Sequence, residues 1–331
     1  MLRQNRLLQF NWLGWALEAD NELLNMRAVG DPELKIYGIF GFPLGHTASP
    51  AIQNCAFDYY KLKSFYFAFE RPPARFRFLM RNLKSLLLEG FNVTVPFKET
   101  VIPYLDRLSP EAKAVGAVNT VKKEKGKWVG YNTDVHGFLA GLKEAKFNLK
   151  GKAALILGAG GSACAVAYAL SRSGVRRILV ANRTRSRAES LVRKLEHVIP
   201  RLDRGIQQLD SRFRGNDKIS FKVLSLREND LKAVLSEVDL LINATKVGLS
   251  KNDGLLVPTK AFPKRKILVY DLIYKPAQTK LLRTARILGH KVINGEAMLL
   301  HQGAKAFEIW TGKPAPIHIM RKVLHDAIHS N

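Results

Sequence analysis

The stretch KAALILGAGGSA, from Lys152 to Ala163, decides the fold of the second half of this chain. Its first half is a short, mostly apolar run that ends at Leu157, which is typical of a strand buried on both faces. Its second half reads G-x-G-x-x-A and leads into a helix expected to reach about Ser173. The glycines permit a tight turn and close backbone approach, and the helix N-terminus faces a diphosphate. The segment therefore predicts a dinucleotide site formed by Gly158, Ala159, Gly160, Gly161, Ser162 and Ala163.

The next expected strand, Arg177 to Ala181, is followed by the basic segment NRTRSR at residues 182–187. A cofactor without a 2′-phosphate usually meets an acidic residue here, which holds its ribose hydroxyls, and this segment has none. The arginines around Thr184 can instead hold a phosphate dianion through charge-assisted, forked hydrogen bonds. The prediction is NADP(H) rather than NAD, and the alternative is a solvated, basic start of a helix.

The first half of the chain carries a second informative stretch, NVTVPFK at residues 92–98. It predicts a β-branched strand that Pro96 ends, because proline offers no ladder donor and fixes its own φ. Lys98 therefore follows a strand end, where open α/β sheets bind ligands, with the Thr94 hydroxyl four residues before it. The alternative for this stretch alone is a surface lysine after an ordinary strand.

Strands alternate with helices from Lys35 onward, which predicts βαβ units and a mainly parallel sheet. Ser49 is expected to cap the helix that begins at Pro50, and Thr133 or Asp134 is a candidate cap for a helix from about Val135. The expected strands are 35–41, 65–70, 91–95, 116–120, 128–133, 152–157, 177–181, 221–224, 239–244, 267–272 and 291–293. Further helices are expected over 50–62, 75–88, 135–145, 230–238, 278–288, 302–310 and 316–328.

The pattern breaks between about residues 197 and 218, where VIPRLDRGIQQLDSRFRGND shows neither a helical nor a strand period. It resembles the translated product of a dispersed bacterial repeat inserted into a reading frame. We expect an inserted, mobile and dispensable loop at the N-terminal side of the strands, away from the ligand edge.

Composition limits the function classes. The 331 residues include 53 Lys and Arg against 28 Asp and Glu, a net charge of +25, but the cations are spread over every segment. A diffuse positive field fits anionic small ligands, and we expect no nucleic-acid partner. Cys55 and Cys164 form neither a disulfide framework nor a zinc site, so we expect no metal and a cytoplasmic protein.

The N-terminal residues 1–34 resemble a signal peptide only weakly, because Gln9 and Asn11 interrupt the apolar part. We interpret them as an extension that is either disordered or the result of a mis-assigned start before Met26. Since no apolar run approaches the roughly 20 residues of a membrane helix, we expect no membrane partner.

Taken together, the motifs resemble the shikimate dehydrogenase family from Lys35 to the C-terminus. They are GFPLGHTASP, NVTVPFKE, GAVNT, NTD, GAGGSA, NRT and the ending YDLIY…NGEAML…Q, in the family's order. The resemblance implies an α/β enzyme of two domains. A substrate domain with a mainly parallel sheet would span 35–133 plus the returning C-terminal helices of 296–331, and a Rossmann-like NADP domain would span 134–295 with the insert at 197–218.

The resemblance also implies the activity: reversible, NADPH-dependent reduction of 3-dehydroshikimate to shikimate in aromatic amino-acid biosynthesis. The enzyme would be an oxidoreductase acting on a CH–OH group, and a monomer or a homodimer. Lys98 and Asp134 would be its acid–base pair. The implied substrate contacts are Thr47, Ser49, Thr94, Lys98, Asn119, Asp134, Tyr274 and Gln302. Beyond the glycine-rich turn, the implied cofactor contacts are Asn182, Arg183, Thr184, Arg187, Thr245, Leu272, Gly295 and Met298.

Two positions depart from the family pattern, which usually has serine at Thr47 and histidine at Gln53. The resemblance implies that Thr47, Ser49 and Tyr274 contact the substrate carboxylate. Thr47 keeps a hydroxyl but adds a methyl group to this carboxylate pocket, so acceptance of quinate or an altered affinity stays open. Gln53 lies on the helix after the loop and is expected to be secondary.

The nearest alternative is a quinate/shikimate dehydrogenase, or a sibling that acts on another cyclic hydroxy acid. A second alternative is a non-catalytic NADP-binding regulator of the same fold, against which the retained Lys98, Asp134, Asn119 and Gln302 argue.

Overall fold

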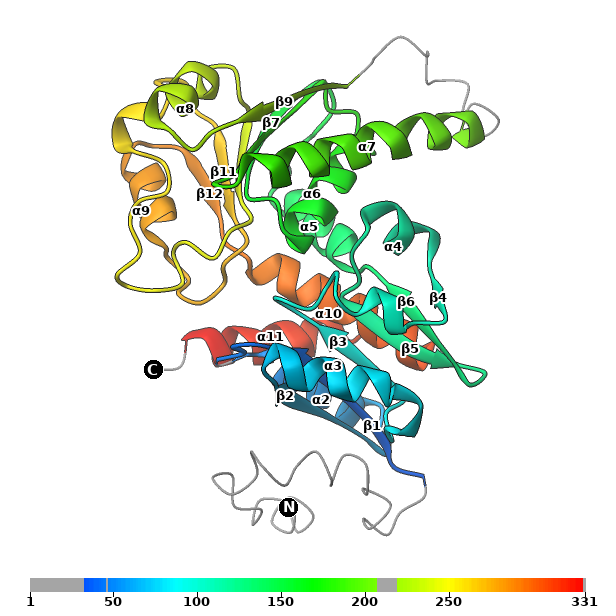
Figure 1. Ribbon diagram of the computed structural model, residues 1–331. Helices are drawn as coiled ribbons and strands as arrows, with labels where there is room; N and C mark the ends of the chain where they lie inside the picture. The colour runs from blue at the N-terminus through cyan, green and yellow to red at the C-terminus, as the bar shows by residue number, and fades with distance from the viewer. Residues whose placement is uncertain (1–32, 46, 207–218, 330–331) are drawn as a thin grey trace.

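The computed structural model describes residues 33–45, 47–206 and 219–329, with only the backbone described for 199–206. Nearly all of the expected N-terminal extension lies outside these ranges, as does His46 of the GFPLGHTASP loop. Figure 1 shows two six-stranded sheets, each with its own helices, and α5 and α10 running between them. The α/β class is confirmed. Every helix within these ranges falls short of the length or the apolar character that a membrane crossing needs.

The second half of the chain forms an entirely parallel sheet in the order β12-β11-β10-β7-β8-β9. The strand order reverses between β7 and β10, and such a reversal is where open parallel sheets bind ligands. Its strands are β7 Ala153–Leu157, β8 Arg177–Ala181, β9 Ser220–Leu224, β10 Leu240–Asn243, β11 Leu268–Asp271 and β12 Lys291–Ile293.

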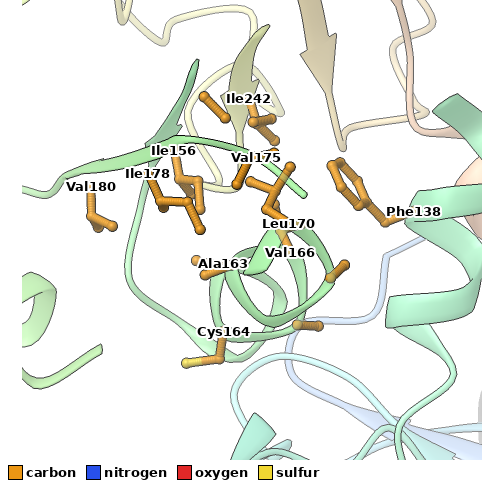
Figure 2. Packing of buried hydrophobic residues seen from close by; sticks show 14 of the residues in the cluster. Phe138, Ile156, Ala163, Cys164, Val166, Leu170, Val175, Ile178, Val180 and Ile242 are labelled. Atoms are coloured by element: carbon orange, nitrogen blue, oxygen red, sulfur yellow. The ribbon is translucent and has the colours of Figure 1, made fainter. Parts of the chain in front are cut away.

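Alternation along β7 divides its side chains between two hydrophobic cores. Ile156 joins the core beneath helix α6 (Gly161–Ser171), whereas Leu157 joins the core on the opposite face. Figure 2 shows Ile156 together with Val166 and Leu170 of α6. Each fully buried aliphatic side chain contributes about 1.5–3 kcal/mol, so both faces hold the sheet in place. The other helices on this sheet are α7 Arg185–Ile206, α8 Glu228–Leu235, η4 Thr259–Ala261 and α9 Lys280–Ile287.

The first sheet has the order β2-β1-β3-β5-β6-β4. Strands β1, β2 and β3 are parallel, β5 runs antiparallel to both β3 and β6, and β4 pairs with β6 in parallel. Its strands are β1 Lys35–Gly41, β2 Ser64–Glu70, β3 Gly90–Val93, β4 Arg107–Leu108, β5 Thr120–Glu124 and β6 Lys127–Tyr131. The two-residue β4 was not expected from the sequence, because so short a strand carries no periodic signal.

Helices from both ends of the chain cover this first sheet. The core that contains Tyr37 of β1 also contains Phe57 of α2, Phe307 of α10 and Met320 of α11. The C-terminal helices therefore pack on the N-terminal strands. The helices of this half are α2 Ser49–Tyr59, α3 Pro73–Arg81, η2 Leu83–Ser85, η3 Ile102–Tyr104, α4 Pro110–Val115, α10 Glu296–Thr311 and α11 Ile317–His329. Helix α5 Asp134–Glu144 lies between the two sheets (Figure 1) and packs its apolar side chains in the core beneath α6.

Two expectations from the sequence were wrong in detail. The loop expected over 197–218 is helical in its first part, because α7 continues to Ile206, and residues 207–218 lie outside the described ranges. Apolar residues of α7 such as Leu191 and Leu195 pack in the core, and this amphipathic helix extends into the unusual tract. Ser49 is not the cap of α2: Ala48 holds that position, and Ser49 is the first helical residue.

Candidate active site

Lys98 lies in a turn that the backbone holds firmly. Strand β3 ends at Val93, and the Phe97 N–H donates to the Thr94 carbonyl over 2.7 Å. The Val118 N–H donates to the Lys98 carbonyl over 2.8 Å, which ties the turn to the segment before β5. The lysine side chain is buried, and the residue is 9% exposed. The alternative of an ordinary surface lysine is therefore wrong.

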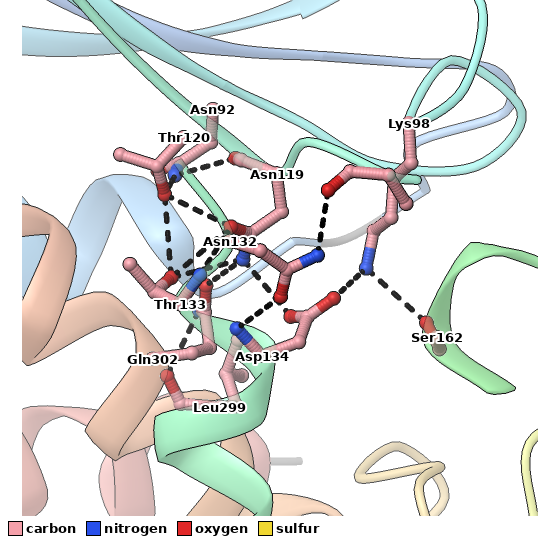
Figure 3. A network of polar contacts seen from close by, with 11 residues as sticks. Asn92, Lys98, Asn119, Thr120, Asn132, Thr133, Asp134, Ser162, Leu299 and Gln302 are labelled. Carbon is pink, nitrogen blue, oxygen red and sulfur yellow. Dashed lines mark hydrogen bonds and ion pairs between the residues drawn. The ribbon is translucent and has the colours of Figure 1, made fainter. Parts of the chain in front are cut away.

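The Lys98 ammonium contacts a carboxylate from another helix. Its Nζ lies 2.5 Å from Oδ2 of Asp134, the first residue of α5, and 3.2 Å from Oγ of Ser162 on α6 (Figure 3). Asp134 is 3% exposed, so the pair is desolvated. Three elements from both halves of the molecule thus meet at one charged group.

Asn119 joins this pair to α10. Its Nδ2 donates to Oδ1 of Asp134 over 2.9 Å and lies 3.2 Å from Oε1 of Gln302. It also donates to Oγ1 of Thr133 over 2.9 Å, while the Thr133 N–H donates to Oδ1 of Asn119 over 2.7 Å. Four of the residues expected at the substrate site, Lys98, Asn119, Asp134 and Gln302, are therefore neighbours.

Asp134 is the first residue of α5 rather than its cap. Thr133 occupies the cap position, but its side chain makes no capping hydrogen bond. The carboxylate of Asp134 points to Lys98 and Asn119 rather than to the helix backbone. The Asp134 N–H instead donates to Oδ1 of Asn132 over 3.1 Å.

A buried polar layer lies behind the site, and its residues were not predicted as site residues from the sequence. Asn92 donates to the Asn119 carbonyl and to Oγ1 of Thr120, each over 2.9 Å, and accepts from the Tyr66 hydroxyl over 2.6 Å. Burial holds the pKa of Tyr66 well above its ordinary value, so this hydroxyl keeps its proton and donates. Because a buried polar group is costly without partners, this layer fixes Asn119. The signal that could have found Asn92 and Thr120 is their position inside the motifs NVTVPFK and GAVNT.

A second group of expected residues meets at the start of α2. Thr47 Oγ1 lies 3.2 Å from Ser49 Oγ and accepts the Ser49 N–H over 3.3 Å. Burial raises the pKa of Tyr274, while hydrogen bonds to Thr47 and to the Ala48 backbone offset part of that rise. Among the described residues, no hydrogen bond joins this trio of hydroxyls to Lys98. Thr94, at the end of β3, is half-buried and its side chain makes no hydrogen bond within the described ranges.

The glycine-rich turn leaves room in front of α6. Gly158 has φ +115°, and a Cβ there would come within 2.9 Å of the Ala244 carbonyl oxygen, so only glycine fits. Gly160 caps α6, and beyond Gly160 and its chain neighbours no heavy atom of the described residues lies within 4 Å of the place where its Cβ would be. An open space before free helix N–H groups is suited to a diphosphate.

The basic segment after β8 is exposed, and one of its arginines is already paired. Arg185 forms an ion pair with Glu189 over 2.8 Å, whereas Arg183 and Arg187 have no acidic partner in the described part of the chain. Asn182 Nδ2 donates to the Thr184 carbonyl over 2.8 Å, which curls the segment. The two unpaired guanidinium groups can receive a phosphate.

The remaining expected cofactor residues follow the carboxyl ends of the central strands. Thr245 donates through Oγ1 to Asn243 over 2.7 Å, and the Leu272 N–H donates to the Asn243 carbonyl over 3.0 Å. Gly295 caps α10 and donates its N–H to the Ile273 carbonyl, while Met298 on α10 is buried in the core beneath α6.

Comparison with known proteins adds to this geometry. Residues 39–121 match the shikimate dehydrogenase substrate binding domain, residues 141–217 match shikimate / quinate 5-dehydrogenase, and residues 295–325 match the shikimate 5'-dehydrogenase C-terminal domain. The shikimate dehydrogenase (NADP(+)) of Desulforamulus reducens is 41% identical over 299 residues, which are 89% of this chain and 96% of that protein. The chain belongs to the shikimate dehydrogenase family.

Solved structures of shikimate dehydrogenases share the fold over the same length. One in complex with NADP+ has a TM-score of 0.77 and 35% identity, covering 91% of this chain and 98% of that chain. The enzyme of Thermus thermophilus, in complex with NADP(H) and shikimate, has a TM-score of 0.72 and 33% identity, covering 89% and 100%. A quinate dehydrogenase of Corynebacterium glutamicum, in complex with NAD, has a TM-score of 0.75 and 28% identity, covering 88% and 99%.

Proposed function

We propose that this member of the shikimate dehydrogenase family reduces 3-dehydroshikimate to shikimate with NADPH, reversibly, with Lys98 and Asp134 as its acid–base pair. The observation that carries the proposal is the buried 2.5 Å contact between Lys98 Nζ and Asp134 Oδ2, which faces the N-terminus of α6. Burying a charged pair lowers the stability of the fold unless further hydrogen bonds compensate, so a pair kept this well buried points to a functional role.

The chemistry requires such a pair. NADPH, when bound, supplies the hydride to the ketone carbon, which leaves an alkoxide oxygen that needs a proton. Lys98 donates that proton from Nζ in the reductive direction and accepts it in the oxidative direction. Asp134 holds the ammonium in place, and Asn119 holds the other carboxylate oxygen by donating to Oδ1.

The residues around the glycine-rich turn suit NADP(H). The space before Gly160 lies at the N-terminus of α6, where backbone N–H groups favour a diphosphate. Arg183 and Arg187 are exposed and without acidic partners among the described residues, so they can hold a 2′-phosphate. Thr245, Leu272, Gly295 and Met298 are proposed to line the adenosine or nicotinamide ends.

Substrate recognition is proposed to use both groups of polar residues. Thr47, Ser49 and Tyr274 present hydroxyl groups that can donate to a carboxylate, and Thr94, Asn119 and Gln302 can read ring hydroxyls. A polyol acid suits such a site, because each missing hydroxyl would leave a buried polar group unpaired.

We also propose the division into a substrate domain of 35–133 plus 296–331 and an NADP domain of 134–295. The shared core of Tyr37, Phe307 and Met320 supports the return of the C-terminal helices to the first sheet. Phe138 of α5 packs in the core of the second sheet instead. A cytoplasmic location and a monomeric or homodimeric state remain predictions.

A quinate dehydrogenase is the second candidate. The observation that favours it is Thr47, whose methyl group changes the expected carboxylate pocket, together with the likeness to a quinate dehydrogenase of 28% identity. The alternative of a non-catalytic regulator is not favoured, because the relatives are named as NADP-dependent dehydrogenases and the pair of Lys98 and Asp134 is intact.

The deciding experiment measures NADPH formation by the purified protein with NADP+ and shikimate, beside quinate and NAD+ in the same assay. We expect shikimate with NADP+ to give the highest kcat/KM. A higher kcat/KM with quinate would show that quinate, rather than shikimate, is the substrate. A preference for NAD+ by more than about tenfold, or about 1.4 kcal/mol, would show that the cofactor is NAD+. Tight NADP+ binding without turnover of either acid would favour the regulator.

A further inference from the structure

The Lys98 ammonium, from the half of the first sheet, is held by two acceptors on two different helices. Asp134 Oδ2, at 2.5 Å, is on α5, and Ser162 Oγ, at 3.2 Å, is on α6 (Figure 3). Lys98 itself follows β3 of the first sheet, whereas α6 follows β7 of the second sheet. The serine hydroxyl therefore links the helix of the cofactor half to the lysine of the substrate half.

Ser162 reaches the lysine because α6 begins close to the aliphatic stem of Lys98. A Cβ at Gly161 would lie 3.0 Å from Cβ and 3.2 Å from Cδ of Lys98, so a side chain at this position would press on the stem. Glycine lets the first turn of α6 pack along the aliphatic part of Lys98. The next residue then has its hydroxyl beside the ammonium.

The two acceptors together define where the remaining proton points. An ammonium group has three N–H bonds and no acceptor capacity. With Asp134 as its one acceptor, the group could rotate about the axis to the carboxylate. A second acceptor in another direction stops that rotation, and the third N–H then has one fixed direction.

We propose that Ser162 is a positioning residue for proton transfer, which acts by fixing the orientation of the Lys98 ammonium. This inference rests on the proposed role of Lys98. In the reductive direction one N–H bond of Lys98 breaks, an O–H bond forms at the alkoxide oxygen, and the nitrogen keeps the electron pair. Solvent protonates the amine before the next turnover. Ser162 changes no bond, and it sets the direction from which the proton leaves.

The test compares Ser162→Ala, Ser162→Thr and the control Ser171→Ala, whose hydroxyl donates to the Tyr168 carbonyl at the other end of the same helix. Losing one hydrogen bond costs about 0.5–1.5 kcal/mol, so kcat of Ser162→Ala should fall by about 2–12-fold. The KM for NADP+ should stay within about twofold of wild type, because the diphosphate is expected on backbone N–H groups, which alanine keeps, whereas the lost hydroxyl contacts Lys98. Ser162→Thr keeps a hydroxyl and should recover most of kcat, and Ser171→Ala should match wild type.

Two further measurements separate positioning from a structural effect. The solvent deuterium isotope effect on kcat should increase in Ser162→Ala, because proton transfer becomes slower relative to the other steps. In a Lys98→Ala background, Ser162→Ala should cause no further loss, since the residue through which it acts is absent.

Other outcomes would overturn the inference. A higher KM for NADP+ at unchanged kcat in Ser162→Ala would show that Ser162 contacts the cofactor. A wild-type kcat in Ser162→Ala would show that its contact with Lys98 does not contribute to turnover. If Lys98→Ala is inactive while Ser162→Ala is normal, this inference fails and the proposed function stands. If Lys98→Ala keeps its kcat, this inference and the proposed acid–base role of Lys98 both fail, whereas the activity itself stands.

Discussion

Gly137 on α5 lies directly against Gln302 on α10. A Cβ at position 137 would come within 2.9 Å of the Gln302 Cβ, 3.0 Å of its backbone nitrogen and 2.6 Å of the Met298 carbonyl oxygen. The two helices that carry Asp134 and Gln302 can approach this closely only because α5 has no side chain at that point. The glycine at position 137 thus sets the distance between α5 and α10 at the site.

Gly137→Ala should therefore affect both stability and substrate binding. Overpacking a close contact with backbone atoms costs about 1–3 kcal/mol, and α10 would move away from α5. Gln302 would then leave Asn119, so the KM for shikimate should rise more than the KM for NADP+. Chemical denaturation and steady-state kinetics measure the two effects.

Gly254→Ala is the matched control, since beyond its chain neighbours no heavy atom of the described residues lies within 4 Å of a Cβ there. Its stability should stay within about 0.5 kcal/mol of wild type. Unchanged stability and an unchanged KM for shikimate in Gly137→Ala would contradict the tight packing of α5 on α10.

Lys98→Ala should lower kcat by roughly 10²–10⁴-fold, the usual contribution of a positioned acid or base. Asp134→Asn should also lower kcat, and the double variant should lose little more than the worse single variant, because the two groups act as a unit. NADP+ binding, measured by calorimetry, should persist in all three proteins.

The exposed Lys127 offers a control for removing a lysine, and Lys127→Ala should keep wild-type kcat. A Lys98→Ala protein with near-normal kcat would remove Lys98 from the mechanism. Strictly additive losses in the double variant would argue against a coupled pair.

Arg183→Ala and Arg187→Ala should weaken the binding of NADP+ without weakening that of NAD+. A hydrogen bond to a charged group contributes about 1.5–3 kcal/mol, which corresponds to roughly 10–100-fold in KM for NADP+. Arg185→Ala is the comparison, because Arg185 is paired with Glu189 and should matter less. Equal losses with both cofactors would show that these arginines do not read the 2′-phosphate.

Stability should fall as the pH drops below about 6.5, in part because of His290. Burial, with a further contribution from Lys266, lowers the pKa of His290 below its ordinary value of 6.5. The unfolded chain then binds a proton more readily than the folded one, so stability is full above pH 6.5 and is lost as the pH falls toward the folded pKa. The neutral ring stacks on Phe262, with 5.3 Å between centroids, and its Nδ1 accepts the Ile267 N–H over 3.4 Å.

His290→Gln should flatten the dependence of unfolding free energy on pH between about pH 6.5 and 5, as measured by urea denaturation. The slope should shrink rather than vanish, since the pKa of His136 is also lowered, by burial and then by Lys305 and His301. A slope identical to that of wild type would show that His290 titrates alike in the folded and unfolded chains.

Much of the fold could be read from local pattern. The apolar run before Gly158 became β7, and the alternation of strands and helices became two sheets. Helix ends were harder to predict: the cap of α2 moved from Ser49 to Ala48, and α7 continued to Ile206. Caps and helix ends depend on tertiary packing, which a window of sequence does not contain.

The candidate site was predictable as a set of residues but not as an arrangement. Resemblance of motifs nominated Lys98, Asn119, Asp134 and Gln302, and the structure brings these four together. It also reveals two features that no motif stated: the contact of Ser162 with Lys98, and the buried layer of Asn92, Thr120 and Tyr66 behind Asn119.

The sequence by itself determined the α/β class, the glycine turn before α6, the basic segment after β8 and the family. These are local properties, because backbone torsion, hydrophobic period and charge act over a few neighbouring residues. Only the tertiary structure decided that Lys98 and Asp134, 36 positions apart, lie 2.5 Å from each other. That contact depends on how α5, α6 and the turn after β3 pack, and such packing is the sum of many weak contacts between segments far apart in the chain.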